Sequence, residues 1–233
     1  MNLFDEIKSL RTGELATLNL RTLYEAYGYK KFSMMKFEEY DFYSQNMDFL
    51  QNNRLLTFTG ASGKLMALRP DVTMSIVKKT RASAKNCEKL YYIENVYRAD
   101  SGAAEFRESS QIGIEHIGQV TPYTTLELTA LAIKSLDIIQ DENILDISHM
   151  GYLNGLLNEY GLSGDEKKRL RRCIESKNAH ELRSIAGDGL PDELTGRLIQ
   201  LMRLPEAFGE ALEIADSICI NDQMRNAISE LAA

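Results

Sequence analysis

The residues best suited to chemistry in this chain lie in one short stretch, Gln111–Ile117. If the stretch is a β-strand, its side chains alternate between two faces, so Gln111, Gly113 and Glu115 share one face. Glycine weakens a strand, and a glycine between two polar residues indicates that something approaches the backbone closely. Two explanations fit this pattern. Either a small ligand rests on Gly113 between Gln111 and Glu115, or the three residues form the solvent face of a half-exposed sheet.

Three further polar residues come before this strand in the sequence. Arg98, at the end of a neighbouring predicted strand, offers a fixed guanidinium for a carboxylate or phosphate. Asp71 and Thr73, at the start of a predicted helix, could bind an ammonium group, but they are equally suited to capping the helix. Together the five candidates supply one cation, two carboxylates, one amide and one hydroxyl, a set that suits a free amino acid.

The sequence shows neither the spacing of a nucleophile–base pair nor that of a metal site. Its cysteines and histidines are far apart, with no CxxC pair: Cys87, Cys173, Cys219, His116, His149 and His180. We expect the cysteines to be ordinary thiols of a reducing compartment, and His149 and His180 to be structural. The predicted site therefore contains no metal and no cofactor.

Hydrophobic periodicity and turn residues predict the elements that position these groups. The expected helices are Asp5–Tyr27, one opened by Arg69–Asp71 and running through Val77, and Thr124–Gln140. The expected strands are Leu55–Thr59, Leu65–Leu68, Leu90–Arg98, Gln111–Ile117 and Ile144–Ser148. Leu90–Arg98 and Gln111–Ile117 should form a hairpin whose tip includes a loop at Ser101–Ala104. The GASGK sequence at Gly60–Lys64 is too short between its glycines for a phosphate-binding loop, so we expect a simple turn.

The kind of secondary structure that the sequence predicts changes near Gly151. Residues 1–150 mix strands and helices, whereas residues 151–233 predict a helix with Leu153, Leu156 and Leu157 followed by three or four more. An α+β domain, 1–150, followed by a mainly helical segment, 151–233, is the expected organisation.

The composition of the chain bears on two classes of function, nucleic-acid binding and membrane association. The chain of 233 residues is 44% hydrophobic. Its net charge of −7 is unfavourable for a protein whose main function is to bind nucleic acid. No stretch approaches the roughly 20 apolar residues of a membrane span, and the N-terminal sequence does not resemble a signal peptide. We expect a cytosolic protein that contacts no membrane.

Three segments resemble linked motifs of the class II aminoacyl-tRNA synthetases, in their histidyl-tRNA synthetase branch. Leu68–Thr73 (LRPDVT) resembles L-R-P-[ED]-x-T, Tyr97–Asp100 (YRAD) resembles the F-R-x-E part of motif 2, and Arg107–Gly118 resembles R-E-F-x-Q-x-G-x-E-x-x-G. The match runs from about Leu15 to Gly151. It implies an antiparallel sheet flanked by helices, and it places the five candidates around bound histidine: Asp71, Thr73, Arg98, Gln111 and Glu115.

Departures from the family's pattern indicate which branch the chain is similar to. Asp-x-Thr after L-R-P is typical of a regulatory, non-aminoacylating paralogue, and Ala99–Phe106, the motif 2 loop, contains no Arg or Lys for ATP phosphates. Asp100 is shorter than the usual glutamate, and Phe32–Glu38 lacks the proline of motif 1. Nothing after Gly151 resembles motif 3, whose arginine stabilises the nucleotide's phosphates, so we expect a chain cut short before its last strands.

The resemblance therefore implies a subunit without chemistry of its own in the first step of histidine biosynthesis. It would assemble with the catalytic ATP phosphoribosyltransferase subunit, bind histidine for feedback control, self-associate through a synthetase-like dimer and bind no tRNA. The alternative is the N-terminal part of an authentic histidyl-tRNA synthetase. A third reading is a stand-alone synthetase-like module with another partner.

Overall fold

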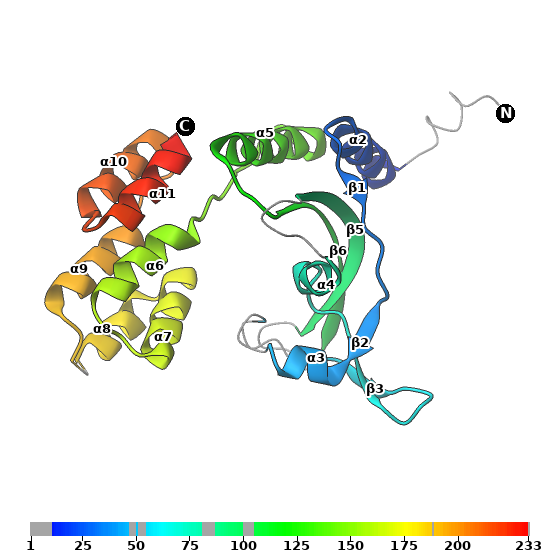
Figure 1. Cartoon of the computed structure of the whole chain (residues 1–233), viewed down its shortest axis with the longest axis horizontal. Coiled ribbons are helices and arrows are strands. Elements are labelled where there is room, and N and C mark those ends of the chain that lie inside the picture. Colours follow the sequence, from blue (N-terminus) through cyan, green and yellow to red (C-terminus); the bar gives the residue numbers. More distant parts are fainter. Residues whose placement is uncertain are drawn as a thin grey trace. The chain divides into compact units, whose positions relative to one another are not determined.

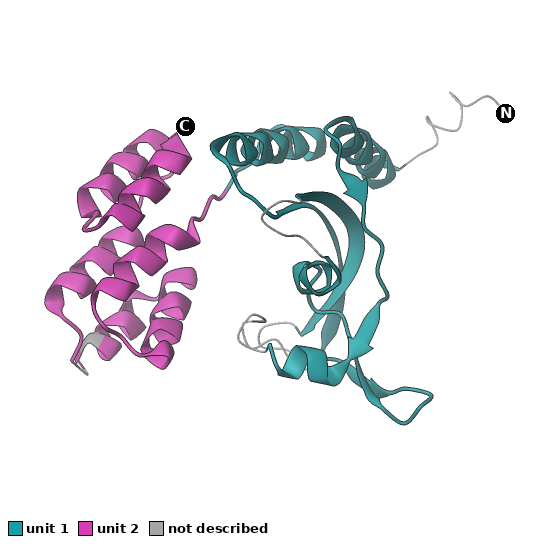
Figure 2. Cartoon of the chain, in the orientation of Figure 1, with its two compact units in different colours: residues 1–145 teal, residues 146–233 magenta. Residues whose placement is uncertain are grey.

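The computed structural model describes residues 11–46, 50, 55–80, 87–99, 105–187 and 189–232. The chain divides into two compact units, residues 1–145 and 146–233 (Figure 2). Unit 1 contains all the strands of the described residues, and unit 2 contains only helices.

The larger sheet of unit 1 is built on two long antiparallel strands. These are β5 (Glu88–Ala99) and β6 (Phe106–Ile117), paired along their whole length, with the short β1 (Lys30–Lys31) added in parallel to β5. The predicted hairpin is therefore confirmed, and its second strand begins five residues earlier than expected. The predicted loop at Ser101–Ala104 lies outside the described residues.

A second, smaller sheet is fully antiparallel. Its order is β2 (Phe37–Glu39), β4 (Leu65–Leu68) and β3 (Thr57–Thr59). The Gly63 amide donates to the Gly60 carbonyl, and the Gly60 amide donates to the Lys64 carbonyl. Gly63 adopts a left-handed conformation, with φ of 77°, which favours glycine. The segment that resembles a phosphate loop is therefore the turn of the predicted hairpin.

Helices cover both faces of the larger sheet (Figure 1). On one face, the apolar side chains of β5 and β6 pack against Leu20 of α2 (Thr12–Ala26) and Leu131 of α5 (Pro122–Ile139). On the other face, α4 (Thr73–Lys79) lies within the curve of the two strands and contributes Ile76 to a cluster that includes Val96. The short α3 (Tyr40–Ser44) packs on the smaller sheet.

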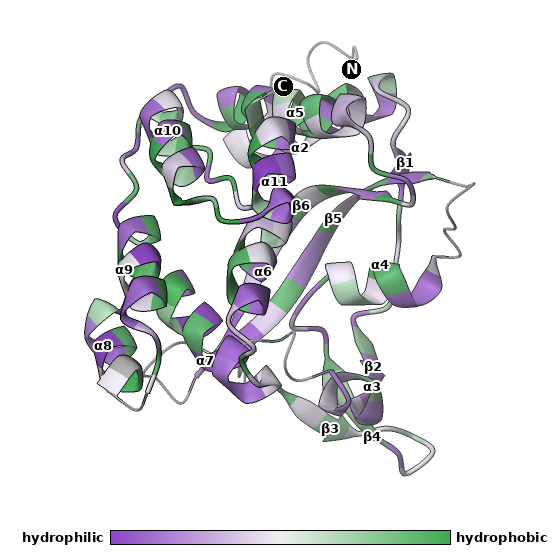
Figure 3. Cartoon of the chain, turned by 60° about the vertical axis from the view of Figure 1, so that its left-hand side comes forward, coloured by the Kyte–Doolittle hydropathy of each residue, from purple (hydrophilic) through white to green (hydrophobic). Residues whose placement is uncertain are grey.

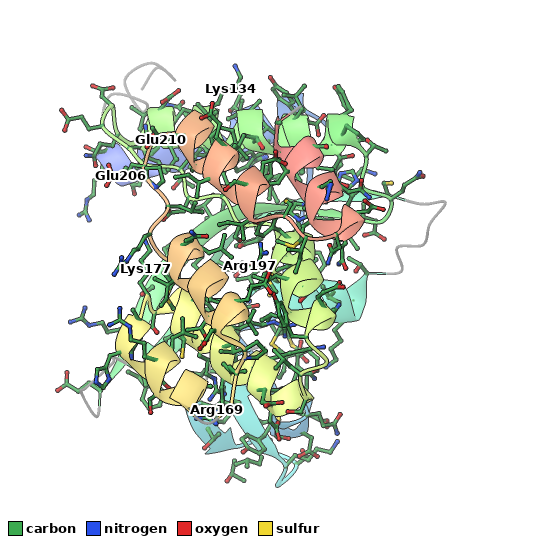
Figure 4. The ribbon with its side chains drawn as sticks, turned by 90° about the vertical axis from the view of Figure 1, so that its left-hand side faces the viewer. Lys134, Arg169, Lys177, Arg197, Glu206 and Glu210 are labelled. Carbon is green, nitrogen blue, oxygen red and sulfur yellow. The ribbon has the colours of Figure 1, made fainter. Side chains whose placement is uncertain are left out.

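Unit 2 is a bundle with its own apolar core. The described residues of this unit form the helices α6 (Met150–Glu159), α7 (Gly164–Glu175), α8 (Ala179–Gly187), α9 (Asp192–Leu201), α10 (Phe208–Ile218) and α11 (Asp222–Ala232). Hydrophobic and hydrophilic residues alternate along these helices (Figure 3). Leu156, Leu170 and Leu198 are fully buried. In Figure 4, Arg197 lies among the helices of this unit, and Arg169 and Lys177 lie nearer its surface.

Three of the predicted segments differ from the structure or extend beyond the residues that it describes. Ile144–Ser148 is not a strand: it pairs with no strand of the described residues, and Ile144 is 76% exposed. Unit 2 has one or two helices more than expected, because two breaks contain neither glycine nor proline. There, Asn178 caps the Glu181 amide at the start of α8, and Asn221 caps the Met224 amide at the start of α11. The first part of the predicted helix Asp5–Tyr27 lies outside the described residues, and Gly28 ends the helix as expected, with φ of 82°.

Candidate functional site

The register of β5 and β6 decides which side chains share the face that α4 covers. Residues directly opposite each other in an antiparallel pair point to the same face. Glu115 lies opposite Leu90, Gly113 opposite Tyr92, and Gln111 opposite Glu94. Arg98, on the same face of β5 by alternation, is thus brought to the side of the sheet that carries Gln111 and Glu115.

Glu115 is tied directly to the helix above it. The Thr73 hydroxyl, in the first turn of α4, donates to Oε1 of Glu115 at 2.6 Å. Burial raises the pKa of the Glu115 carboxyl above its usual value, the hydrogen bond from Thr73 opposes this shift, and the negative charge of Asp71 adds to it. Two predicted site residues, far apart in sequence, therefore form one polar contact.

Asp71 caps α4, which is one of the two roles that its position allowed. The Met74 amide donates to Asp71 Oδ1 at 2.9 Å, which satisfies a free N–H at the start of α4. The other carboxylate oxygen, Oδ2, lies 3.7 Å from Nη2 of Arg98. Arg98 also donates from Nε to the Pro70 carbonyl at 2.8 Å, so its guanidinium is held beside the beginning of the helix.

The five candidates thus lie on one side of the sheet, but they are not equally connected. Two contacts join them in pairs, Thr73 with Glu115 and Arg98 with Asp71. Gln111 is placed with them by strand register alone, and it is half-buried. This side of the sheet therefore carries a guanidinium, two carboxylates, a hydroxyl and an amide.

Tyr92 is a member of this site that the sequence reasoning missed. A Cβ atom added to Gly113 would lie 2.5 Å from the Tyr92 hydroxyl oxygen and 2.6 Å from Cζ of the ring. The close approach that the glycine indicated is therefore made by this neighbouring aromatic side chain. An aromatic residue covering a glycine on the adjacent strand is a known device of sheets, and the cross-strand register was the signal that could have revealed it.

Arg69 is a second residue that the sequence reasoning missed. Its side chain is fully buried and donates to the carbonyls of Met35 and Asn95, at 3.0 and 2.8 Å, and to Oε2 of Glu94, at 2.9 Å. It joins the segment before β2 to β5 at the point where the chain enters α4. Arg69 follows β4 of the smaller sheet, and Glu94 and Asn95 lie on β5 of the larger sheet. These hydrogen bonds therefore hold the two sheets together.

His149, which we expected to be structural, lies at a contact between two helices of unit 2. His149 Nε2 lies 3.0 Å from Oε2 of Glu230 and so joins the start of α6 to α11. The cysteines are free thiols, and among the described residues no group of three His, Cys, Asp or Glu side chains is placed to hold a metal ion. In the same part of the chain, no helix is both long and apolar enough to cross a membrane.

Comparison with known proteins gives one matching family model. The model described as histidyl-tRNA synthetase matches residues 8–233. One relative, the histidine–tRNA ligase of Methanocaldococcus jannaschii, is 29% identical over 203 residues, which are 85% of this chain and 48% of that protein. Another, the ATP phosphoribosyltransferase regulatory subunit of Oceanobacillus iheyensis, is 27% identical over 218 residues, 91% of this chain and 53% of that protein.

The chain therefore spans about half the length of the relatives it matches. Among solved structures, a chain of the ATP phosphoribosyl transferase (HisG:HisZ) complex from Thermotoga maritima aligns with a TM-score of 0.65. That match is 18% identical and covers 93% of this chain and 74% of the other. It is evidence for the fold alone. Together with the matching histidyl-tRNA synthetase model and the solved structures of that family, it confirms the expected class II synthetase-like fold of small sheets flanked by helices.

Proposed function

This chain belongs to the histidyl-tRNA synthetase family, and we propose that within the family it is a regulatory subunit of ATP phosphoribosyltransferase. In this role it carries no chemistry of its own and assembles with a catalytic phosphoribosyltransferase subunit in the first step of histidine biosynthesis. We also propose that it self-associates through the synthetase-like domain.

The observation that carries this proposal is the amino-acid composition of the segment that joins β5 to β6. Ala99–Phe106 contains no Lys or Arg, although adenylate formation requires cations at the triphosphate. Two arginines flank this segment, Arg98 and Arg107, and Arg98 is held by the Pro70 carbonyl and Asp71. An amino-acid site of this kind fits binding better than activation of the amino acid with ATP.

The comparisons support the same assignment. A relative that aligns over 91% of this chain is named as an ATP phosphoribosyltransferase regulatory subunit, and a complex of ATP phosphoribosyl transferase contains a chain of the same fold. Relatives of similar identity are named histidine–tRNA ligases, so aminoacylation is the competing function.

We further propose that the ligand of the site is histidine, bound by Asp71, Thr73, Arg98, Gln111 and Glu115. A zwitterionic amino acid needs a cation for its carboxylate and an anion for its ammonium group, and Arg98 and Glu115 supply these two charges. Binding of histidine here would let the product of the pathway act on the complex.

The assignment is tested by co-expressing the chain with a catalytic ATP phosphoribosyltransferase subunit. We expect the two to co-purify as one complex in size-exclusion chromatography. Separate elution of the two proteins would contradict the regulatory assignment and favour a synthetase.

Histidine binding is tested separately by isothermal titration. We expect heat from the unmodified protein and its loss in Glu115→Ala, because the substitution removes the carboxylate that faces the ammonium group. Glu142→Ala, an exposed residue outside the site, is the matched control and should bind as the unmodified protein does. Equal binding by the two variants would contradict the proposed site.

A further inference from the structure

A cysteine and a histidine meet at the end of the larger sheet where the chain leaves β6. The thiol of Cys87, just before β5, donates to the Gln119 carbonyl, with 3.6 Å between sulfur and oxygen. Nε2 of His116, on β6, lies 3.2 Å from the same carbonyl oxygen. Cys87 and His116 are far apart in the sequence, and the hairpin brings both side chains to one oxygen atom.

The register of the hairpin explains why the two side chains meet. Lys89 lies directly opposite His116, so the two share a face of the sheet. Cys87, two residues before Lys89, lies on that face by alternation and is a diagonal neighbour of His116. Glu115 points to the other face. The pair therefore lies outside the proposed amino-acid site, and the inference does not depend on the proposed function.

Solutes can reach this pair from the surface. Cys87 is exposed and His116 is half-buried. Nδ1 of the imidazole is buried and has no hydrogen-bond partner in the part of the chain that the structure describes, so Nε2 is the ring nitrogen open to a ligand. Lys89 is held in an ion pair by Glu127, at 2.6 Å, which reduces its repulsion of a second cation on this face.

The spacing of the three atoms fits a tetrahedral zinc ion. Thiolate sulfur and imidazole nitrogen are ligands that Zn²⁺ prefers in proteins. With bonds of about 2.3 Å to sulfur, about 2.05 Å to nitrogen and about 2.1 Å to oxygen, tetrahedral angles place sulfur about 3.6 Å and nitrogen about 3.4 Å from the oxygen. The observed separations are 3.6 and 3.2 Å. No third His, Cys, Asp or Glu side chain joins the pair among the described residues, so the carbonyl and a water molecule would complete the four ligands.

We propose that Sγ of Cys87, Nε2 of His116 and the carbonyl oxygen of Gln119 bind a divalent cation of the zinc type. The ion replaces the thiol proton, which passes to solvent, and the sulfur binds the metal as a thiolate. The ion then joins the residue before β5 to the end of β6 and to the segment that leads into α5. Because it binds the folded chain, it stabilises this end of the sheet.

Spectroscopy with Co²⁺ tests the thiolate ligand. A cobalt ion bound to cysteine absorbs in the near ultraviolet through sulfur-to-metal charge transfer. We expect this band when CoCl₂ is added to the reduced full chain, and we expect an excess of ZnCl₂ to remove it. Cys87→Ser should lack the band. Cys219→Ser is the matched control, because the Cys219 thiol also donates to a carbonyl, that of Ala215, at 3.5 Å, and its loss should leave the band unchanged.

Isothermal titration with ZnCl₂ tests the imidazole ligand. His116→Ala should raise the dissociation constant for zinc at least about tenfold, since even the loss of a group that only orients a ligand costs that much. His180→Ala, at an exposed position in α8, is the control and should bind as the unmodified protein does. Zinc should also raise the melting temperature of the unmodified protein by several degrees and leave that of Cys87→Ser unchanged.

The opposite results would overturn the proposal. A band that is absent from the unmodified protein, or that persists in Cys87→Ser, would show that Cys87 binds no metal. Equal zinc affinity in His116→Ala and the unmodified protein would show that the imidazole is not a ligand. Two ordinary hydrogen bonds to the Gln119 carbonyl would then account for the geometry. Far-UV circular dichroism confirms that all variants are folded.

Discussion

Arg69 is a charged side chain at the centre of unit 1, with no exposed surface. It donates to two backbone carbonyls and to Glu94, whose own side chain is 17% exposed. Removing one partner of a buried pair leaves the other charge and its neighbours without compensation. We predict that Arg69→Ala lowers the free energy of unfolding by about 3 kcal/mol in urea titrations. Arg21→Ala, which breaks an exposed ion pair with Glu25, is the control and should change it by less than about 1 kcal/mol.

Glu115 gives a pH dependence whose sign follows from its raised pKa. The folded protein holds the Glu115 proton more tightly than the unfolded chain does, so this group stabilises the fold fully below the ordinary carboxyl pKa of 4.5. That contribution is lost as the pH rises through the folded-state pKa. We predict that the stability of the unmodified protein relative to Glu115→Gln falls between pH 4 and neutrality. Urea unfolding of both proteins across this range measures the difference, and a constant or rising difference would contradict the raised pKa.

At the scale of single elements, α7 shows how local sequence begins a helix. The Ser163 hydroxyl accepts from the Glu166 amide, and the Glu166 carboxylate accepts in return from the Ser163 amide, at 2.8 Å. This capping box satisfies free N–H groups at the start of the helix. We predict that Ser163→Ala lowers the free energy of unfolding by about 1 kcal/mol. Ser184→Ala, at an exposed position within α8, provides the matched control and should have little effect. Equal losses would argue against the cap.

At the scale of the whole molecule, unit 2 has the core of an independent domain. Its buried residues contact one another in a single cluster that includes Leu157 and Leu182, both with no exposed surface. A compact core of its own is what allows a domain to fold alone. We predict that residues 146–233, produced as a separate fragment, are helical and unfold cooperatively in thermal circular dichroism. Leu157→Ala in this fragment should cost about 2–5 kcal/mol. A fragment that melts without cooperativity would show that its core depends on unit 1.

The sequence by itself determined the local features of this protein. Strand alternation placed Gln111, Gly113 and Glu115 on one face, and the position of Asp71 before a helix made it suited to cap that helix. Both features depend only on neighbours along the chain. The same local patterns predicted a strand at Ile144–Ser148 that does not form, since a strand also needs a partner, and the pattern of one segment does not reveal one.

Only the tertiary structure decided which residues meet across the sheet. Register set Tyr92 opposite Gly113, so that the space left by the glycine is filled by a ring. The path of the chain between the two sheets brought Arg69 to the carbonyls of Met35 and Asn95. These contacts join segments more than 20 residues apart, and their geometry depends on the packing of whole strands, so neither composition nor periodicity contains them.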